Sequence, residues 1–173
     1  GGMELFKAEV PGPVKDKMAP RVAETARLLW KVYLGLAMAQ FALLLFTGQG
    51  AYLAICHAFA TMATGGFSPL ASSIESLDSP MTEWIVVVFM GFAGANFSLH
   101  LNALRTRSPV HLKDQEFRFY ALLALVVTAG LALSLWRGQG LPFGDGIRAA
   151  AFQTMSILTT TGFVVADFDL WPA

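Results

Sequence analysis

Charged residues and cysteine are scarce in this sequence. Charged residues make up 14% of the 173 residues, whereas average soluble proteins contain roughly 25%. Twelve Lys and Arg balance twelve Asp and Glu, which excludes a strongly basic nucleic-acid binder and a disordered acidic chain. The one cysteine, Cys56, cannot form an internal disulfide. Hydrophobic residues supply 55% of the chain, and this composition indicates a membrane protein.

Three runs are long and apolar enough to cross a bilayer as helices: residues 25–46, 84–104 and 119–136. A hydrocarbon core about 30 Å thick needs about 20 helical residues, and a helix satisfies its own backbone polar groups in lipid. The alternative, three buried helices of a soluble protein, needs polar faces that this sequence does not supply. We therefore expect an all-α integral membrane protein in contact with the lipid bilayer.

Two further apolar runs, residues 50–61 and 146–158, are too short to cross the bilayer. Runs of about 10–14 residues are typical of buried or re-entrant segments. Each run follows a span and a glycine-bearing connector. Asp145 is expected to cap the second short helix, and Ser79-Pro80 to start the helix that closes the first unit.

The basic residues predict the orientation of the chain. Most of them lie before or within the first span, or between the second and third spans, which leaves only Arg137 and Arg148 on the other side. The positive-inside bias then places residues 1–24 and 105–118 in the cytoplasm, so both short helices enter from outside. The basic residues on the cytoplasmic side are Lys7, Lys15, Lys17, Arg21, Arg27, Lys31, Arg105, Arg107, Lys113 and Arg118.

The order of elements repeats along the chain. Thr64-Gly65 aligns with Thr161-Gly162 at an offset of 97 residues, and repetition on this scale indicates a membrane architecture built from copies of one unit. We expect a fragment that holds one complete unit and part of a second. The first unit covers 25–104, with short helix 50–61 and Thr/Gly segment 62–68; the second covers 119–173, with span 119–136, short helix 146–158 and segment 159–165, its closing helix missing.

A half-length helix followed by Thr-x-Gly is typical of ion coordination in a membrane. The C-terminal end of such a helix carries partial negative charge, and an extended segment can direct carbonyls at an axis, where they replace the water of a dehydrated cation. Glycine permits backbone geometry that a side chain resists. Neither segment contains a carboxylate, so neutral oxygens favour a monovalent cation, with potassium the better candidate.

At these residues the chain resembles the Trk/Ktr/HKT superfamily of potassium transporters, most closely the bacterial Trk branch (TrkH type). The resemblance implies repeated helix–pore loop–helix units, pseudo-fourfold when complete, of which this chain would hold the second and part of the third. It also implies a bacterial cytoplasmic (inner) membrane location, potassium uptake, a cytoplasmic nucleotide-binding regulatory subunit and a homodimer of pore subunits. The region of the gating residues would be missing. The matching stretches are residues 5–36, 57–69, 91–100, 113–120 and 150–163.

The resemblance assigns a selectivity filter residue by residue, through backbone carbonyls alone and with no organic cofactor or catalytic residue. The first segment differs from the second in having Met62-Ala63 where the other has Thr159-Thr160, so a hydroxyl-lined site would differ between units. The expected potassium ligands are the carbonyls of Ala63, Thr64, Gly65, Gly66, Thr160, Thr161, Gly162 and Phe163.

Four pairs of polar residues allow other interpretations. Cys56-His57 is expected to be a packed pair on a short helix, although an intramembrane enzyme would need such residues. Asn96 and His100 are equally compatible with function and with a tight helix contact near Gly91, Gly94 and Ala95. The acidic residues Asp114 and Glu116 are compatible with a solvated turn or a regulator-docking surface, and Asp167 and Asp169 with an ion entrance or a helix cap. A passive membrane scaffold would not require the Thr-x-Gly segments.

Overall fold

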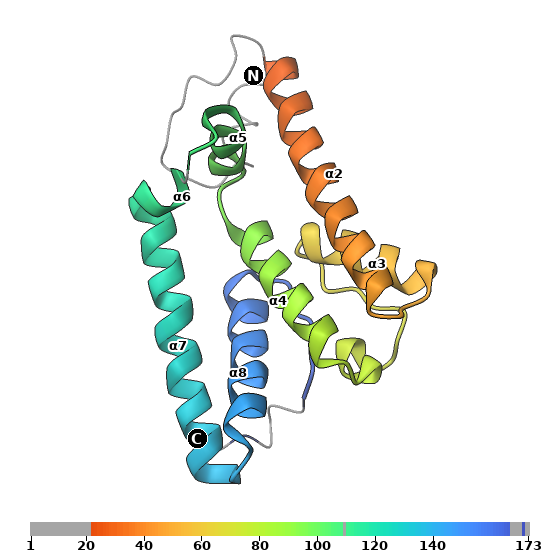
Figure 1. Ribbon diagram of the computed structural model, residues 1–173, viewed down its shortest axis with the longest axis vertical. Coiled ribbons are helices and arrows are strands. Elements are labelled where there is room, and N and C mark those ends of the chain that lie inside the picture. The colour runs from red at the N-terminus through yellow and green to blue at the C-terminus, as the bar shows by residue number, and fades with distance from the viewer. Residues whose placement is uncertain (1–21, 109, 167–170, 172–173) are drawn as a thin grey trace.

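The computed structural model is entirely helical over the residues that it describes, which are 22–108, 110–166 and 171. The expectations for residues 1–21, Asp167 and Asp169 lie outside these residues. The all-α fold predicted from the sequence is confirmed (Figure 1). The helices are α2 (Val22–Phe46), α3 (Ala51–Met62), the 3-10 helix η1 (Ser73–Leu77), α4 (Pro80–Gly94), α5 (Phe97–Thr106), α6 (Val110–Lys113), α7 (Gln115–Gln139) and α8 (Phe143–Leu158).

Two helices, α2 and α7, are long enough to cross a membrane. Each has 25 residues, which corresponds to about 37 Å at 1.5 Å per residue. Their most apolar stretches, Glu24–Phe46 and Gln115–Gly138, are only 22% and 11% buried within the chain. Exposure of so many apolar side chains to water would be unfavourable, so lipid or further protein covers them instead. These helices contain the predicted spans 25–46 and 119–136.

The predicted span over residues 84–104 is not one continuous helix. α4 and α5 are separated by a break of 95°. Ala95 ends α4 in an extended conformation, and Asn96 caps α5, its side-chain oxygen accepting a hydrogen bond from the Ser98 N–H at 3.0 Å. An asparagine after Gly94 favours a new helix start over continuation, because its side chain competes for backbone donors. The expected second span is therefore a pair of helices with a break rather than a single helix.

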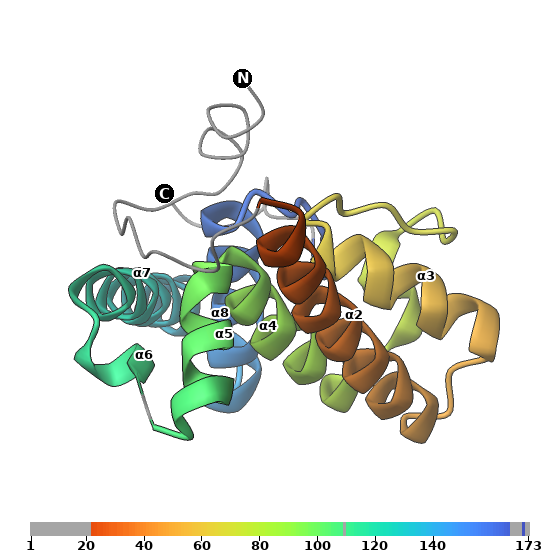
Figure 2. The same ribbon diagram turned by 90° about the horizontal axis from the view of Figure 1, so that it is seen from above.

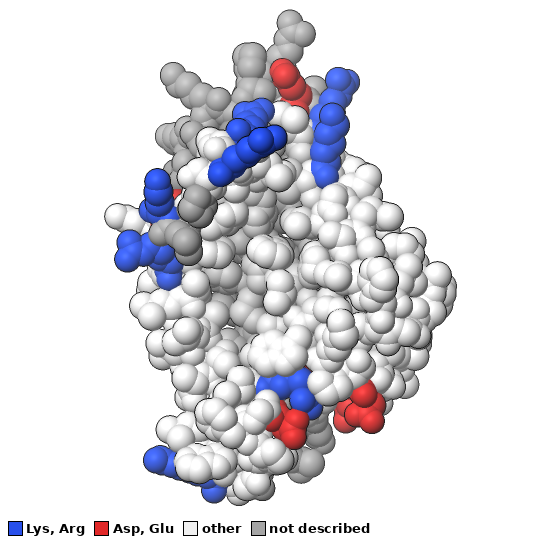
Figure 3. Space-filling model, in the orientation of Figure 1, with Lys and Arg blue, Asp and Glu red and all other residues white. Residues whose placement is uncertain are grey.

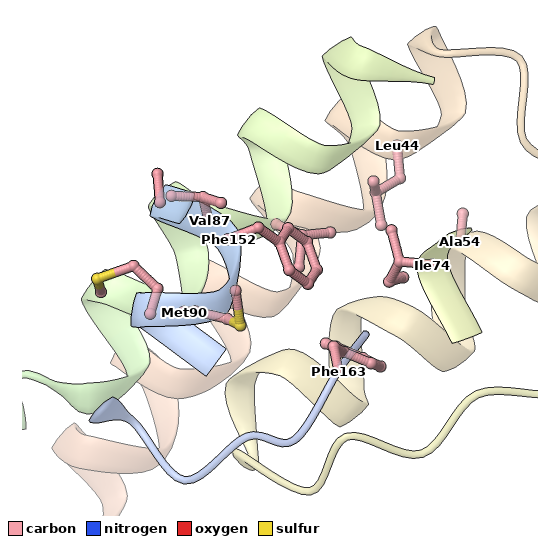
Figure 4. Close-up of a cluster of buried hydrophobic side chains, with 10 residues drawn as sticks. Leu44, Ala54, Ile74, Val87, Met90, Phe152 and Phe163 are labelled. Atoms are coloured by element: carbon pink, nitrogen blue, oxygen red, sulfur yellow. The ribbon is translucent and has the colours of Figure 1, made fainter. Parts of the chain in front are cut away.

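The helices form two groups that share α4. α3 packs against α2 and α4, whereas α8 packs against α7 and α4. Figures 1 and 2 both show α2 and α7 on opposite sides, with α4 and α8 between them. The core cluster between the groups includes Leu44, Ile74, Met90, Phe152 and Phe163 (Figure 4). Phe163 belongs to the extended segment after α8, so this segment is anchored in the core of the molecule.

The N-terminal ends of α4 and α8 are capped differently. Ser79 caps α4 as expected, since its hydroxyl accepts the Thr82 N–H at 3.3 Å, and Pro80 follows at the first helical position. α8 instead begins at Phe143 after Pro142, so the expectation that Asp145 is its N-cap is wrong. Asp145 lies in the first turn of α8, where it forms an ion pair with Arg148 at 2.7 Å. Arg148 also pairs with Glu83 of α4 at 2.9 Å, which ties α8 to α4.

Basic side chains gather at one end of the molecule. Figure 3 shows them over α5, α6 and the beginning of α2, and the middle of the same face is nearly free of charge. This distribution is the one expected of a membrane protein with an apolar belt.

Candidate functional site

The two short helices, α3 and α8, end in the same hydrogen-bonded turn. The Gly65 N–H donates to the Ala60 carbonyl at 2.8 Å and the Thr64 N–H to the Thr61 carbonyl at 3.0 Å. In the second unit, the corresponding bonds run from Thr161 to Ser156 at 2.9 Å and from Thr160 to Ile157 at 3.0 Å. This pattern is the Schellman motif, which satisfies the last carbonyls of a helix and redirects the chain.

Threonine occupies the left-handed position of both turns. Thr64 has φ +49° and Thr160 has φ +58°. Glycine usually fills this position, and a β-branched residue there is a conformational outlier that costs about 1–3 kcal/mol. Because the same strain occurs at equivalent positions of both units, it indicates a site where the backbone path is constrained.

The structure corrects the alignment of the two units by one residue. Gly66 (φ +63°) is equivalent to Gly162 (φ +82°), and both adopt a backbone conformation that favours glycine. The offset is therefore 96 residues, from 66 to 162, rather than 97. At this offset, Gly65 is equivalent to Thr161. Ala63 is equivalent to Thr159, which corrects the expected pairing of Met62-Ala63 with Thr159-Thr160. The two segments are thus residues 63–69 and 159–165, directly after α3 and α8; Met62 belongs to α3.

The two segments touch each other through their backbones. A Cβ atom on Gly66 would lie 2.0 Å from the Thr161 carbonyl oxygen and 3.1 Å from the Gly162 carbonyl carbon. No side chain fits in that space. A Cβ atom on Gly162 would meet no described atom within 4 Å. Gly66 is therefore required for contact between the segments, and Gly162 faces open space at the equivalent position.

The carbonyls of the segments differ in their hydrogen bonding. Among the described residues, none donates a hydrogen bond to the carbonyls of residues 63–66 or 160–162. The Phe163 carbonyl differs, because it accepts the Ser156 hydroxyl at 2.7 Å. The Val164 carbonyl accepts the Glu75 N–H at 3.2 Å. Seven of the eight carbonyls assigned from the sequence thus accept no hydrogen bond from the described residues, and that of Phe163 is engaged by α8.

Two threonine hydroxyls of the second segment have no counterpart in the first. The Thr159 and Thr161 hydroxyls lie 2.7 Å apart, and Thr159 also donates to the Met155 carbonyl at 2.7 Å. The equivalent residues in the first segment, Ala63 and Gly65, carry no hydroxyl. Apart from the hydroxyls of Thr64 and Thr160, the oxygens that both segments share are therefore backbone carbonyls.

Charged metal ligands are not gathered in the part of the chain that the structure describes, where no group of three or more His, Cys, Asp or Glu side chains could hold a metal ion. Any cation at the segments would therefore meet neutral oxygens.

His57 connects the first segment to the helices behind it. The side chain is fully buried on α3, and its Nε2 lies 2.9 Å from the Ser68 hydroxyl. Burial disfavours the charged form of this imidazole, because a charged ring would lose its hydration there. The sequence favoured a packed Cys56-His57 pair over a site, and the polar residues Gln49 and Ser68, 8 and 11 positions away, were the available signal for these contacts.

Comparison with known proteins assigns the chain to a family. The family described as "TrkH: Cation transport protein" matches residues 1–173. The chain belongs to the TrkH family. It is 41% identical to the Escherichia coli Trk system potassium uptake protein TrkH over 175 residues, and 32% identical to the TrkG protein of the same organism. These matches cover 99% of this chain and 36% of each relative, so the chain spans about a third of their length.

A solved structure gives the same assignment. The crystal structure of the potassium transporter TrkH from Vibrio parahaemolyticus matches with a TM-score of 0.87 and 35% identity, over 97% of this chain and 37% of that chain. The predicted membrane fold is therefore confirmed. The TrkH family consists of transport proteins rather than enzymes, which removes the intramembrane-enzyme interpretation of Cys56 and His57.

In this TrkH-family chain, the side chains of Asn96 and His100 form hydrogen bonds at the break between α4 and α5. The His100 Nε2 lies 2.9 Å from the Phe92 carbonyl at the end of α4, and its Nδ1 lies 2.9 Å from the His111 Nε2. Gly94 allows a close approach, since a Cβ atom there would lie 2.6 Å from the Thr159 side chain. Of the two interpretations, these contacts favour hydrogen bonding at a helix contact.

Proposed function

We propose that this chain forms part of a potassium-uptake pore of the Trk type, in which the backbone carbonyls of two filter segments replace the water of a dehydrated ion. We define the filter segments as residues 63–67 and 159–163, which are equivalent at the offset of 96 and contain all eight carbonyls assigned from the sequence. The observation that carries the proposal is their geometry: two strained turns at the ends of short helices, in backbone contact, with seven carbonyls that accept no bond from described residues. Backbone carbonyls without partners are rare in proteins, and a bound cation would satisfy them.

Potassium is the cargo that fits these oxygens best. Carbonyls are neutral, no carboxylate lies in either filter segment, and the C-terminal ends of α3 and α8 add partial negative charge. This combination suits a monovalent ion that loses its water readily. The names of the relatives, which describe potassium uptake proteins, support the same choice.

The contacts between the two units support a pseudo-fourfold arrangement. Phe163 is 0% exposed and packs against the α3 helix of the first unit, whereas its equivalent, Phe67, is 81% exposed. Gly162 faces open space where its equivalent Gly66 touches the neighbouring segment. Each unit thus has one face that contacts the other unit, at Phe163 and Gly66, and one face that no unit of this chain covers, at Gly162 and Phe67. Further units next to Phe67 and Gly162 would cover both faces and close a pore.

The orientation and the partners follow from the same proposal. The basic end would face the cytoplasm of a bacterial inner membrane, and the short helices would enter from outside. The ends of α5 and α6 supply Arg105, Arg107 and Lys113. The relatives are named as parts of a Trk system, which supports further subunits. From the resemblance, these would be a cytoplasmic nucleotide-binding regulatory subunit and a second copy of the pore subunit in a homodimer. The membrane potential would then drive cation entry, because it contributes about 2.3 kcal/mol per charge per 100 mV.

The test is potassium uptake by the gene product that carries this chain, expressed in a bacterial host that lacks its own uptake systems. We expect growth on limiting potassium, and we expect Gly66→Ser and Gly162→Ser to remove or relax ion preference. Cys56→Ala serves as a control on α3, because Cys56 contributes no carbonyl to the filter segments. Unchanged uptake and ion preference in both glycine variants, at equal protein level in the membrane, would show that the filter assignment is wrong.

A further inference from the structure

His57 contacts both filter regions from a buried position on α3. Its Nε2 lies 2.9 Å from the hydroxyl of Ser68, two residues beyond Gly66. The edge of its ring meets the ring of Phe163 at a centroid distance of 6.0 Å and an angle of 82°. Phe163 is itself 0% exposed. One side chain therefore touches the far ends of both segments, which belong to different units.

The imidazole is held by a chain of side-chain hydrogen bonds. Its Nδ1 lies 3.4 Å from the Gln49 side-chain oxygen, and the Gln49 amide donates to the Thr82 hydroxyl at 3.1 Å. Thr82 donates to the Thr47 hydroxyl at 3.1 Å, and Thr47 donates to the Leu44 carbonyl at 2.7 Å. The chain runs from the end of α2, through the first turn of α4, to the pore-facing helix α3.

The directions of these bonds determine which nitrogen of His57 carries the proton. Because the Thr47 hydroxyl and the Gln49 amide are donors, the Gln49 oxygen is left to accept from the Nδ1–H of His57. The neutral ring then accepts the Ser68 hydroxyl proton at Nε2. Ser68 in turn accepts the Leu70 N–H at 3.1 Å. Every member of the chain is satisfied in one arrangement, which favours a single position of Ser68.

We propose that His57 is a positioning residue for ion selectivity: it holds Ser68 by a hydrogen bond and Phe163 by ring contact, and so sets the distance between the two filter segments. His57 does not bind the ion. The proposal rests on the proposed function, because it concerns the same carbonyls. A displaced segment would place its carbonyls at the wrong distance for a dehydrated potassium ion, and the preference over sodium would fall.

The equivalent residue of the second unit provides a guide to the variants. Gln153 occupies the position of His57 on α8 and is 6% exposed. Glutamine reaches as far as Nε2 of histidine, and asparagine reaches only as far as Nδ1. His57→Gln should therefore keep the bond to Ser68 and lose the bond to Gln49, whereas His57→Asn should do the reverse.

The experiment measures the ratio of potassium to sodium uptake by the gene product in the uptake-deficient host, together with thermal stability of the purified protein. We expect the ratio to fall about fivefold for Ser68→Ala and for His57→Asn, as for the loss of one hydrogen bond, and further for His57→Ala. His57→Gln should retain most of the ratio. In a double-mutant cycle, Ser68→Ala should add little to His57→Ala, because one bond is lost in both. Cys56→Ala, one residue away on α3, should leave the ratio unchanged.

The outcomes separate this proposal from the proposed function. Equal ratios for wild type, His57→Asn and Ser68→Ala, with Gly66→Ser still defective, would refute positioning by His57 and leave the filter assignment intact. A uniform loss of stability with unchanged ratio would also refute it, since packing alone would then explain His57. If the unsubstituted gene product takes up no potassium, both proposals fail.

Discussion

The two filter segments share a backbone but differ in what surrounds them. Thr64 and Thr160 adopt the same left-handed conformation, and the turns that precede them use equivalent hydrogen bonds. The phenylalanine after each filter glycine differs: Phe163 is buried in the core and Phe67 is 81% exposed. The part that is alike is the part that would coordinate an ion. The exposure of the phenylalanine differs because the other unit covers Phe163, whereas no unit of this chain covers Phe67.

The side chains of the two segments differ in a second way. Thr159 and Thr161 bring hydroxyls to the second segment, and their equivalents Ala63 and Gly65 bring none. A function carried by hydroxyls would therefore differ between the units, whereas a function carried by carbonyls would not. The comparison favours the carbonyls as the shared ligands.

The largest effect is expected from Gly66→Ala. The new methyl group would lie 2.0 Å from the Thr161 carbonyl oxygen, so the two segments must separate and potassium uptake should be abolished. Gly65→Ala is the matched control, because its Cβ would meet ring atoms of the exposed Phe67 side chain at 3.2 Å and 3.3 Å, and its nearest backbone atom, the Ala60 oxygen, only at 3.9 Å. Growth on limiting potassium, at equal protein level, measures both. Equal defects would restore the alignment at an offset of 97.

The two phenylalanines provide the next test. Phe163→Ala should lower the free energy of unfolding by about 3–5 kcal/mol, as for other buried phenylalanines. Phe67→Ala should cost nearly as much if another unit covers Phe67 in the assembled protein. The measurement is thermal unfolding of the purified gene product in detergent. A negligible effect of Phe67→Ala would leave Phe67 exposed in the assembly and contradict the closed arrangement.

The ion pairs of Arg148 distinguish the second short helix from the first. The position equivalent to Arg148 on α3 is Tyr52, which is 69% exposed. Arg148→Met should leave Glu83 unpaired and cost about 1–3 kcal/mol, less than for a fully buried pair because these side chains are 23% and 13% exposed. Tyr52→Met is the control and should change thermal stability little. The double variant Glu83→Gln with Arg148→Met should recover part of the loss.

The smallest effect is expected from relief of backbone strain. Thr64→Gly or Thr160→Gly removes a β-branched residue from a left-handed position, and the gain is offset by the greater freedom of glycine in the unfolded chain, so stability should rise by no more than about 1 kcal/mol. Uptake should become less selective, because the segment becomes more flexible. If both variants lose stability instead, the threonine side chains stabilise the turns and strain is not the dominant contribution.

Much of this fold could be predicted from the sequence, because bilayer thickness translates directly into helix length. The runs 25–46 and 119–136 lie within α2 and α7, and the short runs 50–61 and 146–158 correspond to α3 and α8. The break at Ala95 and Asn96 could not be predicted in the same way. Hydropathy averages over a window, and it does not detect a local competition for backbone donors at a single asparagine.

Details of the candidate site were harder to predict. Thr-x-Gly located both segments, but the pair Gly65-Gly66 left their alignment ambiguous by one residue. The φ angles resolved it, since Gly66 and Gly162 have positive φ in the two segments, as do Thr64 and Thr160 two residues before them, whereas Gly65 does not. The engagement of the Phe163 carbonyl by Ser156 also lies beyond sequence reasoning, because it depends on how the chain turns back against α8.

Apolar length, charge asymmetry and repeated Thr/Gly segments determined that this chain is a helical membrane protein with two equivalent short helices, because these properties depend on residue type and spacing alone. The tertiary structure decided which glycine touches the neighbouring segment, which carbonyls accept no hydrogen bond from the described residues, and that His57 contacts the ends of both segments. Such features depend on distances between residues nearly a hundred positions apart in the sequence, and only packing brings those residues together.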